Sequence, residues 1–163
     1  MSVWQNGDAY PCCIYHWDMP IGNINEAGFK GAWNSEKMRD LRMRMINNEP
    51  SEGCKKCINY DDQGIISYRH KFNTEYNHHY NLVETTSDDG SVEQMNLAYF
   101  DVRFSNLCNM KCRSCGPRYS SAWVPDAKKL GWISEQEKVW HIKETEKVTN
   151  VDFLKASVDK VKT

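Results

Sequence analysis

Alternating apolar and polar residues at the start of the chain predict a β-hairpin. Residues 3–5 and 8–10 both have strand character, and Asn6-Gly7 stands between them. An Asn-Gly pair suits a type I′ turn, because both central positions of that turn need a positive φ. The chain is therefore expected to open with two short antiparallel strands joined by a tight turn.

A helix is predicted after the hairpin, where apolar residues recur at helical spacing. Met38, Leu41 and Met45 fall on one face. Asn34 is the expected N-cap, with Trp33 before it and Met38 four residues after it in the arrangement of a hydrophobic staple. The polar stretch 47–51, which contains Pro50, is expected to end this helix.

The last part of the chain predicts a strand, a cysteine-rich loop and helices. The strand is indicated by alternating apolar residues, which are Ala98, Phe100, Val102 and Phe104. Helical sequence interrupted by Pro125 follows the loop. Further helix starts are expected at Ser134, which forms a capping box with Glu137, and at Asn150.

These patterns divide the chain into three zones, at residues 1–62, 63–96 and 97–163. The middle zone is polar and is read as a connector with at most one short helix, and Asp88-Asp89-Gly90 is read as a turn. Its His78-His79 pair is interpreted as a solvated surface pair, since no carboxylate or cysteine stands nearby at ligand spacing.

Charge and hydropathy exclude several classes of partner. The formal net charge is −1 with 26% charged residues, so no strong field of one sign points to nucleic acid or to an anionic membrane. No apolar run approaches the ~18 residues of a membrane helix. Residues 1–10 lack the plan of a signal peptide. We therefore expect a cytoplasmic protein.

The cysteine content changes the picture, because seven cysteines in a cytoplasmic chain need a chemical reason. Their odd number and the reducing compartment both argue against a disulfide framework. Metal or cluster binding is the better interpretation. The spacing of the cysteines then decides which metal chemistry to expect.

Cys108, Cys112 and Cys115 lie on one loop directly after the predicted strand. A 4Fe–4S cluster is commonly held by four thiolates. Three thiolates leave one iron open, and that iron can chelate the amino and carboxylate groups of S-adenosylmethionine (SAM). Zinc in a Cys3His site is the alternative, although zinc sites usually present cysteines in pairs two residues apart.

The spacing Cys-x3-Cys-x2-Cys after a strand resembles the radical SAM superfamily, and residues 102–112 look like its first strand and cluster loop. The following Cys115-Gly116-Pro117 and Ser120-Ser121-Ala122-Trp123 are similar to a phage-associated subgroup. The resemblance implies a 4Fe–4S cluster, bound SAM, and reductive cleavage of SAM to a 5′-deoxyadenosyl radical. It also implies a partial TIM-type barrel, a backbone contact from Ser114 to the adenine, and an electron donor such as flavodoxin or ferredoxin.

The first zone resembles a twitch or SPASM-type module, which holds an auxiliary iron–sulfur cluster. The resemblance rests on Tyr10-Pro11-Cys12-Cys13, Ile21-Gly22-Asn23-Ile24, Ala32-Trp33-Asn34-Ser35, the Met-rich helix and Cys54-x2-Cys57. Adjacent residues of an extended segment point to opposite sides, so only one of Cys12 and Cys13 is expected to join Cys54 and Cys57. Cys12 is the favoured ligand. A zinc ribbon on Cys54 and Cys57 stays open as the alternative.

The expected fold class is α/β, with a small α+β auxiliary-cluster module followed by the first βα portion of a barrel. The Gly-Gly-Glu motif by which the resembled family meets the SAM amino group does not occur in the sequence. The chain is therefore expected to be truncated relative to that family. Two functions remain open. One is a radical SAM enzyme or fragment acting on an unknown substrate, for which the resemblance implies a peptide. The other is a non-catalytic zinc- or cluster-binding module or partner subunit.

Overall fold

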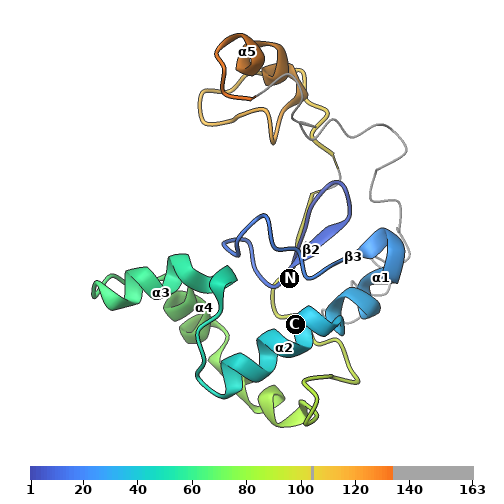
Figure 1. The fold of residues 1–163 in the computed structure, drawn as a ribbon, viewed down its shortest axis with the longest axis vertical. Coiled ribbons are helices and arrows are strands. Elements are labelled where there is room, and N and C mark those ends of the chain that lie inside the picture. Colours follow the sequence, from blue (N-terminus) through green and yellow to red (C-terminus); the bar gives the residue numbers. More distant parts are fainter. Residues whose placement is uncertain (104, 134–163) are drawn as a thin grey trace. The chain divides into compact units, whose positions relative to one another are not determined.

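The computed structural model describes residues 1–103 and 105–133, and their contacts form two compact units (Figure 1). The first unit consists of Met1–Val3 and Asp8–Asp101. The second consists of Trp4–Gly7 and the described residues that follow Asp101.

A small sheet organises the first unit. Strands β1 (Ser2–Val3) and β2 (Asp8–Tyr10) pair antiparallel, and β2 also pairs antiparallel with β3 (Gly22–Asn23). The strand order is β3-β2-β1-β4, where β4 is Asp101–Val102. Side chains of β1 and β2 are almost fully enclosed, since Val3 and Ala9 are both 0% exposed. The predicted hairpin is therefore confirmed.

The turn of the hairpin differs from the predicted type I′. Gly7 has a φ of 88°, whereas Asn6 is not among the residues with positive φ, and type I′ needs both. The Gly7 N–H donates to the carbonyl of Trp4 at 2.8 Å. The turn thus spans four residues and uses glycine only at its last position, which leaves Asn6 in an ordinary conformation.

Helix α1 (Ile24–Trp33) packs on the sheet and was not expected from the sequence. Its N-cap is Asn23, whose side chain accepts a hydrogen bond from the N–H of Asn25 at 2.9 Å. Gly28 has non-helical angles (φ 66°, ψ 176°) inside the helix, and this break obscures the helical periodicity. A Cβ on Gly22 would lie 3.4 Å from the backbone of Ala32, an ordinary packing distance that places this part of α1 directly beside β3.

Helix α2 (Glu36–Ile46) is the predicted Met-rich helix, but it starts one residue later than expected. Its N-cap is Ser35 rather than Asn34, and the Ser35 hydroxyl accepts from the N–H of Met38 at 3.2 Å. Met38 and Leu41 are buried as predicted, whereas Met45 is 56% exposed. The helix ends before residues 47–51, as predicted.

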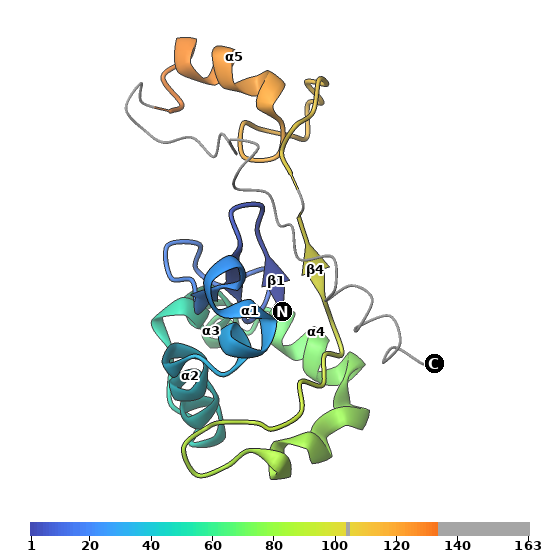
Figure 2. The same cartoon turned by 90° about the vertical axis from the view of Figure 1, so that its right-hand side faces the viewer.

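The 3₁₀ turn η1 (Glu52–Cys54) and helix α3 (Lys55–Asp62) close the first zone (Figure 2). The middle zone holds one short α-helix, as expected, which is α4 (Tyr68–Glu75), and in addition the 3₁₀ segment η2 (Asn77–Thr85). Ser67 supplies the signal for α4, because its hydroxyl caps the N–H of His70. The His78-His79 pair is exposed on η2, with ring centroids 4.1 Å apart.

A polar clamp attaches the turn at residues 87–92 to the helices. The Asn34 side chain donates to the carbonyl of Val92 at 2.8 Å and accepts from its N–H at 3.1 Å. Arg42 donates to the carbonyl of Gly90 at 2.8 Å and to the carbonyl of Trp33. Burial lowers the pKa of Arg42 to about 10. The predicted turn at residues 88–90 is confirmed and is fixed by these bonds.

The second unit is small. Its buried side chains include Trp4 and Val124, and Arg103 lies over the Trp4 ring at 4.5 Å. The 3₁₀ turn η3 (Ser121–Trp123) leads into α5 (Val124–Lys129), and Pro125 lies in the first turn of that helix, where proline is tolerated. The helix therefore begins at Val124, directly before the proline, and is not interrupted by it.

The predicted strand of residues 97–163 is shorter than expected, and the two last predicted helices lie outside the described residues. The strand predicted from Ala98 is reduced to Asp101–Val102 in the described residues. Phe104 and the helices expected at Ser134 and Asn150 lie outside the described residues. The mixed α/β class is confirmed, while the barrel stays a prediction. No helix in the described part is long and apolar enough to span a membrane.

Replacing Gly90 with alanine should destabilise the first unit. Gly90 has a φ of 79°, and an added Cβ would overlap the backbone of Arg39. We expect a loss of about 2 kcal/mol, from left-handed strain and the steric overlap together. Gly64→Ala is the matched control, because its φ is 72° with nothing within 4 Å. Urea midpoints should fall further for Gly90→Ala, and equal shifts would contradict the packing argument.

The Asp89 carboxylate should make stability depend on pH in the acid range. Hydrogen bonds from Ser91, and then Arg39, lower the pKa of Asp89 to about 2. Because the folded pKa lies below the ordinary value near ~3.9, this stabilisation is present above that value and is lost as the pH falls toward 2. In Asp89→Asn, the urea midpoint of unfolding should depend less on pH between pH 4 and pH 2. Asp88→Asn is the charge-matched control, and an unchanged slope in Asp89→Asn would contradict the assignment.

Candidate functional site

The segment that carries Cys12 is held against the start of α3 by Tyr15 and His16. A turn closes at Tyr15, whose N–H donates to the carbonyl of Cys12 at 3.4 Å. The next N–H, of His16, donates to the carbonyl of Gly53 at 3.0 Å. The Tyr15 ring lies directly on Gly53, where an added Cβ would overlap the ring. These contacts bring two segments about 40 residues apart together.

Cys54 and Cys57 are placed by the turn between α2 and α3. Cys54 is the last residue of η1, and its N–H donates to the carbonyl of Ser51 at 2.9 Å. Cys57 lies in the first turn of α3 and is 9% exposed. A spacing of three residues places both side chains on the same side of the helix start.

The charges of Cys12, Cys54 and Cys57 act on one another. Burial, and then the charges of Cys12 and Cys57, raise the pKa of Cys54 to about 11. Burial also raises the pKa of Cys12, with smaller contributions from Cys13 and Cys57. Each of the three thiols therefore lies within electrostatic range of the other two. At neutral pH the thiols of Cys12 and Cys54 are protonated.

Cys13 has a different neighbour. Its side chain interacts with the phenol of Tyr99, whose pKa is raised by burial and then by the charges of Cys13 and Asp101. Cys12 and Cys13 lie at the start of the turn that closes at Tyr15, and Cys13 acts on both Cys12 and Tyr99. Which of the two adjacent cysteines is a ligand stays a prediction.

The donor set of these three thiols fits an iron–sulfur or zinc centre by its chemistry. Soft thiolates are the preferred ligands of both, and all seven cysteines are free. In residues 1–103 and 105–133, no group of three or more His, Cys, Asp or Glu is arranged closely enough to hold a metal ion as it stands. The choice of Cys12, Cys54 and Cys57 as ligands therefore stays a prediction.

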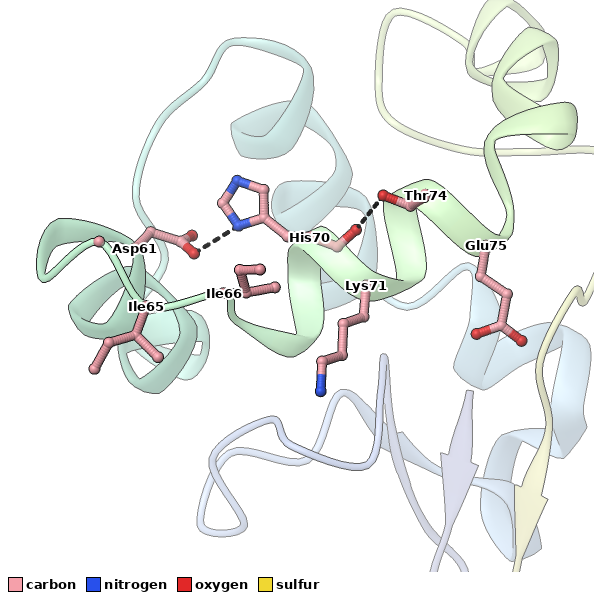
Figure 3. A pocket seen from close by; sticks show the side chains of 8 residues that line it. Asp61, Ile65, Ile66, His70, Lys71, Thr74 and Glu75 are labelled. Carbon is pink, nitrogen blue, oxygen red and sulfur yellow. Dashed lines mark hydrogen bonds and ion pairs between the residues drawn. The ribbon is translucent and has the colours of Figure 1, made fainter.

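A cation stands beside this cluster of thiols. Asp61 at the end of α3 binds Arg69 at 2.6 Å and the Nδ1 of His70 at 2.8 Å, which joins α3 to α4. The charge of Arg69 favours the thiolate of Cys54. A pocket of about 660 Å³ adjoins this connection and is lined by Asp61, His70, Ile65, Ile66 and Lys71. Figure 3 shows these side chains and the bond between Asp61 and His70. Asp61 thus holds the α3–α4 connection that positions Arg69.

The second unit holds the loop with Cys108, Cys112 and Cys115 by its backbone. The N–H of Cys115 donates to the carbonyl of Cys112 at 3.0 Å, and the N–H of Met110 donates to the sulfur of Cys108 at 3.4 Å. Cys112 is exposed, and the other two are partly exposed. Ser114 is exposed between them. The roles of Ser114 and of these cysteines stay predictions.

The residues after the loop fasten it from behind. The buried hydroxyl of Ser120 donates to the carbonyl of Met110 at 2.7 Å. Ser121 accepts from the N–H of Cys108 at 3.3 Å, and the indole N–H of Trp123 donates to the carbonyl of Cys112 at 3.2 Å. The segment that looked like a subgroup signature in the sequence therefore has a structural task, which is to fix the loop.

Sequence reasoning missed the residues that assemble the first site. Tyr15, Ser51 and Gly53 stand close to cysteines, but nothing in their spacing marks them. Gly53 was the available signal, because a glycine directly before a cysteine permits close packing of another side chain. Only the fold shows that this side chain is Tyr15.

One comparison with known proteins gives a match. Residues 1–58 match the family model of SPASM, described as an iron–sulfur cluster-binding domain. No curated protein sequence and no solved structure gives a significant match to the chain. The matched residues contain Cys12, Cys13, Cys54 and Cys57. This match supports an iron–sulfur cofactor and fits an auxiliary module of a radical SAM protein.

The contact between Tyr15 and Gly53 can be tested by a double-mutant cycle. Gly53→Ala should lower the free energy of unfolding by about 2 kcal/mol, because the new Cβ overlaps the Tyr15 ring. In a Tyr15→Ala background the same substitution should cost less than half of that, since the ring is gone. Urea unfolding of the four proteins measures the coupling. Additive effects would show that the ring does not lie on Gly53.

Proposed function

We propose that the chain is an iron–sulfur protein of the radical SAM class, in which residues 1–62 hold an auxiliary cluster. The observation that carries the proposal is the SPASM match over residues 1–58, which contain Cys12, Cys54 and Cys57. The electrostatic influence of these thiols on one another supports their choice as ligands. Thiolates are the usual ligands of iron–sulfur clusters. The three cysteines are the proposed ligands.

The protein's own residues prepare this site. Burial and mutual repulsion keep the thiols of Cys12 and Cys54 protonated in the apoprotein, so binding of the centre must release protons. Arg69, held by Asp61, adds a positive charge that favours the thiolate of Cys54. Tyr15 and Gly53 keep the Cys12 segment against the start of α3. A bound auxiliary cluster would supply electron transfer or a place to anchor substrate.

We further propose that Cys108, Cys112 and Cys115 hold a 4Fe–4S cluster with one open iron for SAM. Support comes from their spacing and from the hydroxyl and indole bonds that fix the loop. When bound, that cluster supplies the electron that cleaves SAM to a 5′-deoxyadenosyl radical. The backbone beside Ser114 is the proposed contact for the adenine. The proposed electron donor is a flavodoxin or ferredoxin, the proposed substrate class is peptide, and the proposed location is the cytoplasm.

The auxiliary site predicts a specific loss of iron. After anaerobic reconstitution, Cys54→Ala/Cys57→Ala should bind less iron and sulfide than the unsubstituted chain while the Cys108 centre survives, because the proposed auxiliary centre loses two ligands. Cys13→Ala is the matched control and should retain the full content, since Cys13 faces Tyr99. Stoichiometric zinc with no sulfide in the unsubstituted chain would favour the zinc-binding alternative.

The second site predicts a response to SAM. In the Cys54→Ala/Cys57→Ala background, the reduced cluster should give an electron paramagnetic resonance signal that changes on addition of SAM, because SAM binds the open iron. Cys112→Ala should abolish the signal, since two thiolates do not retain the cluster. A signal that persists unchanged with SAM present would overturn the proposal of an open iron.

A further inference from the structure

The tip of the N-terminal hairpin, Trp4–Gly7, belongs to the unit that holds the cysteine loop, residues 108–115. The first two side chains of the tip are buried, since Trp4 is 6% exposed and Gln5 is 1% exposed. The Nε2 of Gln5 donates to the backbone carbonyl of Arg118 at 3.0 Å. Because Arg118 comes shortly after the cysteine loop, this bond attaches the end of the loop to the hairpin tip.

Trp4 joins the two ends of the same loop. Arg103, which precedes the cysteine loop, lies over the Trp4 ring at 4.5 Å and over the Tyr119 ring at 5.0 Å. The centroids of the Trp4 and Tyr119 rings are 6.1 Å apart, and the Nη1 of Arg103 donates to the Tyr119 hydroxyl at 3.4 Å. A guanidinium over a tryptophan face is attracted by the quadrupole of the ring. The residues that enter and leave the loop are therefore held together on the buried Trp4.

From this base the hold extends to the loop that carries the cysteines. Ser120 and Ser121 come directly after Tyr119, and their hydroxyls bond the backbone of Met110 and Cys108. A loop whose ends are tied has less conformational freedom than one whose ends are free. A continuous chain of contacts thus runs from the hairpin tip to the backbone of the cysteine loop.

The Gln5 amide has a feature that packing does not explain. Its Oε1 is buried and has no hydrogen-bond partner among the described residues. An unpaired buried acceptor costs stability, and an apolar side chain of similar size avoids that cost. Replacing Gln5 with leucine therefore removes the bond to Arg118 and the unpaired oxygen together, so a loss of loop positioning can be separated from a loss of stability.

We propose that Trp4 and Gln5 are positioning residues that hold the cysteine loop in the arrangement that binds SAM. This inference rests on the proposed SAM-binding cluster of that loop. Neither residue is a proposed ligand, and both act through the residues at the base of the loop. When a binding-competent arrangement is only partly populated, the apparent affinity falls with the populated fraction. Loosening the base should therefore weaken SAM binding while the three thiolates still assemble the cluster.

The test measures the apparent dissociation constant of SAM, by titrating the electron paramagnetic resonance signal in the Cys54→Ala/Cys57→Ala background. Gln5→Leu should weaken SAM binding about tenfold, the order expected for one hydrogen bond. Trp4→Leu should also weaken it, whereas Trp4→Phe keeps an aromatic face under Arg103 and should stay closer to the parent. Gln63→Leu makes the same chemical change at an exposed position, and this control should leave the affinity unchanged.

Iron and sulfide contents and thermal midpoints are measured on the same samples. Full cluster content and an unchanged thermal midpoint, with weakened SAM binding in Gln5→Leu, support the proposal. If Trp4→Leu does not fold, Gln5→Leu decides alone.

An unchanged affinity in Gln5→Leu overturns the proposal and leaves the SAM-binding cluster standing. Weakened binding with a lowered thermal midpoint, or an equal weakening in Gln63→Leu, assigns the effect to general destabilisation and also overturns it. Loss of the cluster from Gln5→Leu would place its role in cluster assembly and overturn the role in SAM binding. A parent protein whose signal does not respond to SAM would overturn both this inference and the proposed open iron.

Discussion

The seating of the Tyr15 ring on Gly53 is the contact on which the first unit's arrangement of thiols depends. Cys12 follows a strand of the sheet, whereas Cys54 and Cys57 lie where α2 has ended and α3 begins. The turn between α2 and α3 is not part of the sheet that carries the Cys12 segment. The ring on Gly53, together with the hydrogen bond from His16, fixes the distance between them. Because a Cβ would occupy the space of the ring, glycine at position 53 is a steric requirement of the site.

The two cysteine groups are held by different physics. In the first unit, the thiols come from separate segments: Cys57 is buried, Cys12 and Cys54 are partly exposed, and desolvation raises the pKa of Cys12 and Cys54. In the second, the three cysteines belong to one loop, are at least partly exposed, and are fixed by hydrogen bonds from Ser120, Ser121 and Trp123 to backbone atoms. A loop fixed from behind leaves its sulfurs accessible, which suits a centre that must meet a substrate.

Sequence reasoning worked where a signal was local. The hairpin, the Met-rich helix and the turn at Gly90 each depend on a few neighbouring residues, and all are present. It failed where distant contacts decide. Helix α1 was missed because Gly28 interrupts its periodicity, and the N-cap moved to Ser35 because Asn34 bonds Val92, 58 residues away. The cysteine spacings were visible, but Tyr15 and Ser51 enter the site only through the fold.

Burial of the first thiol cluster creates an electrostatic conflict that only a cation or a proton resolves. Thiolates at Cys12, Cys54 and Cys57 would repel one another in a partly desolvated place, and the pKa of Cys54 near 11 expresses that cost. Without a metal the conflict is avoided by protonation, so the apoprotein keeps its packing. A cluster on these proposed ligands would replace those protons with iron. Residual negative charge would then fall on the sulfurs, and the charge of Arg69 favours the thiolate of Cys54. The same burial that makes the empty site neutral would therefore make the filled site sensitive to the charges around it.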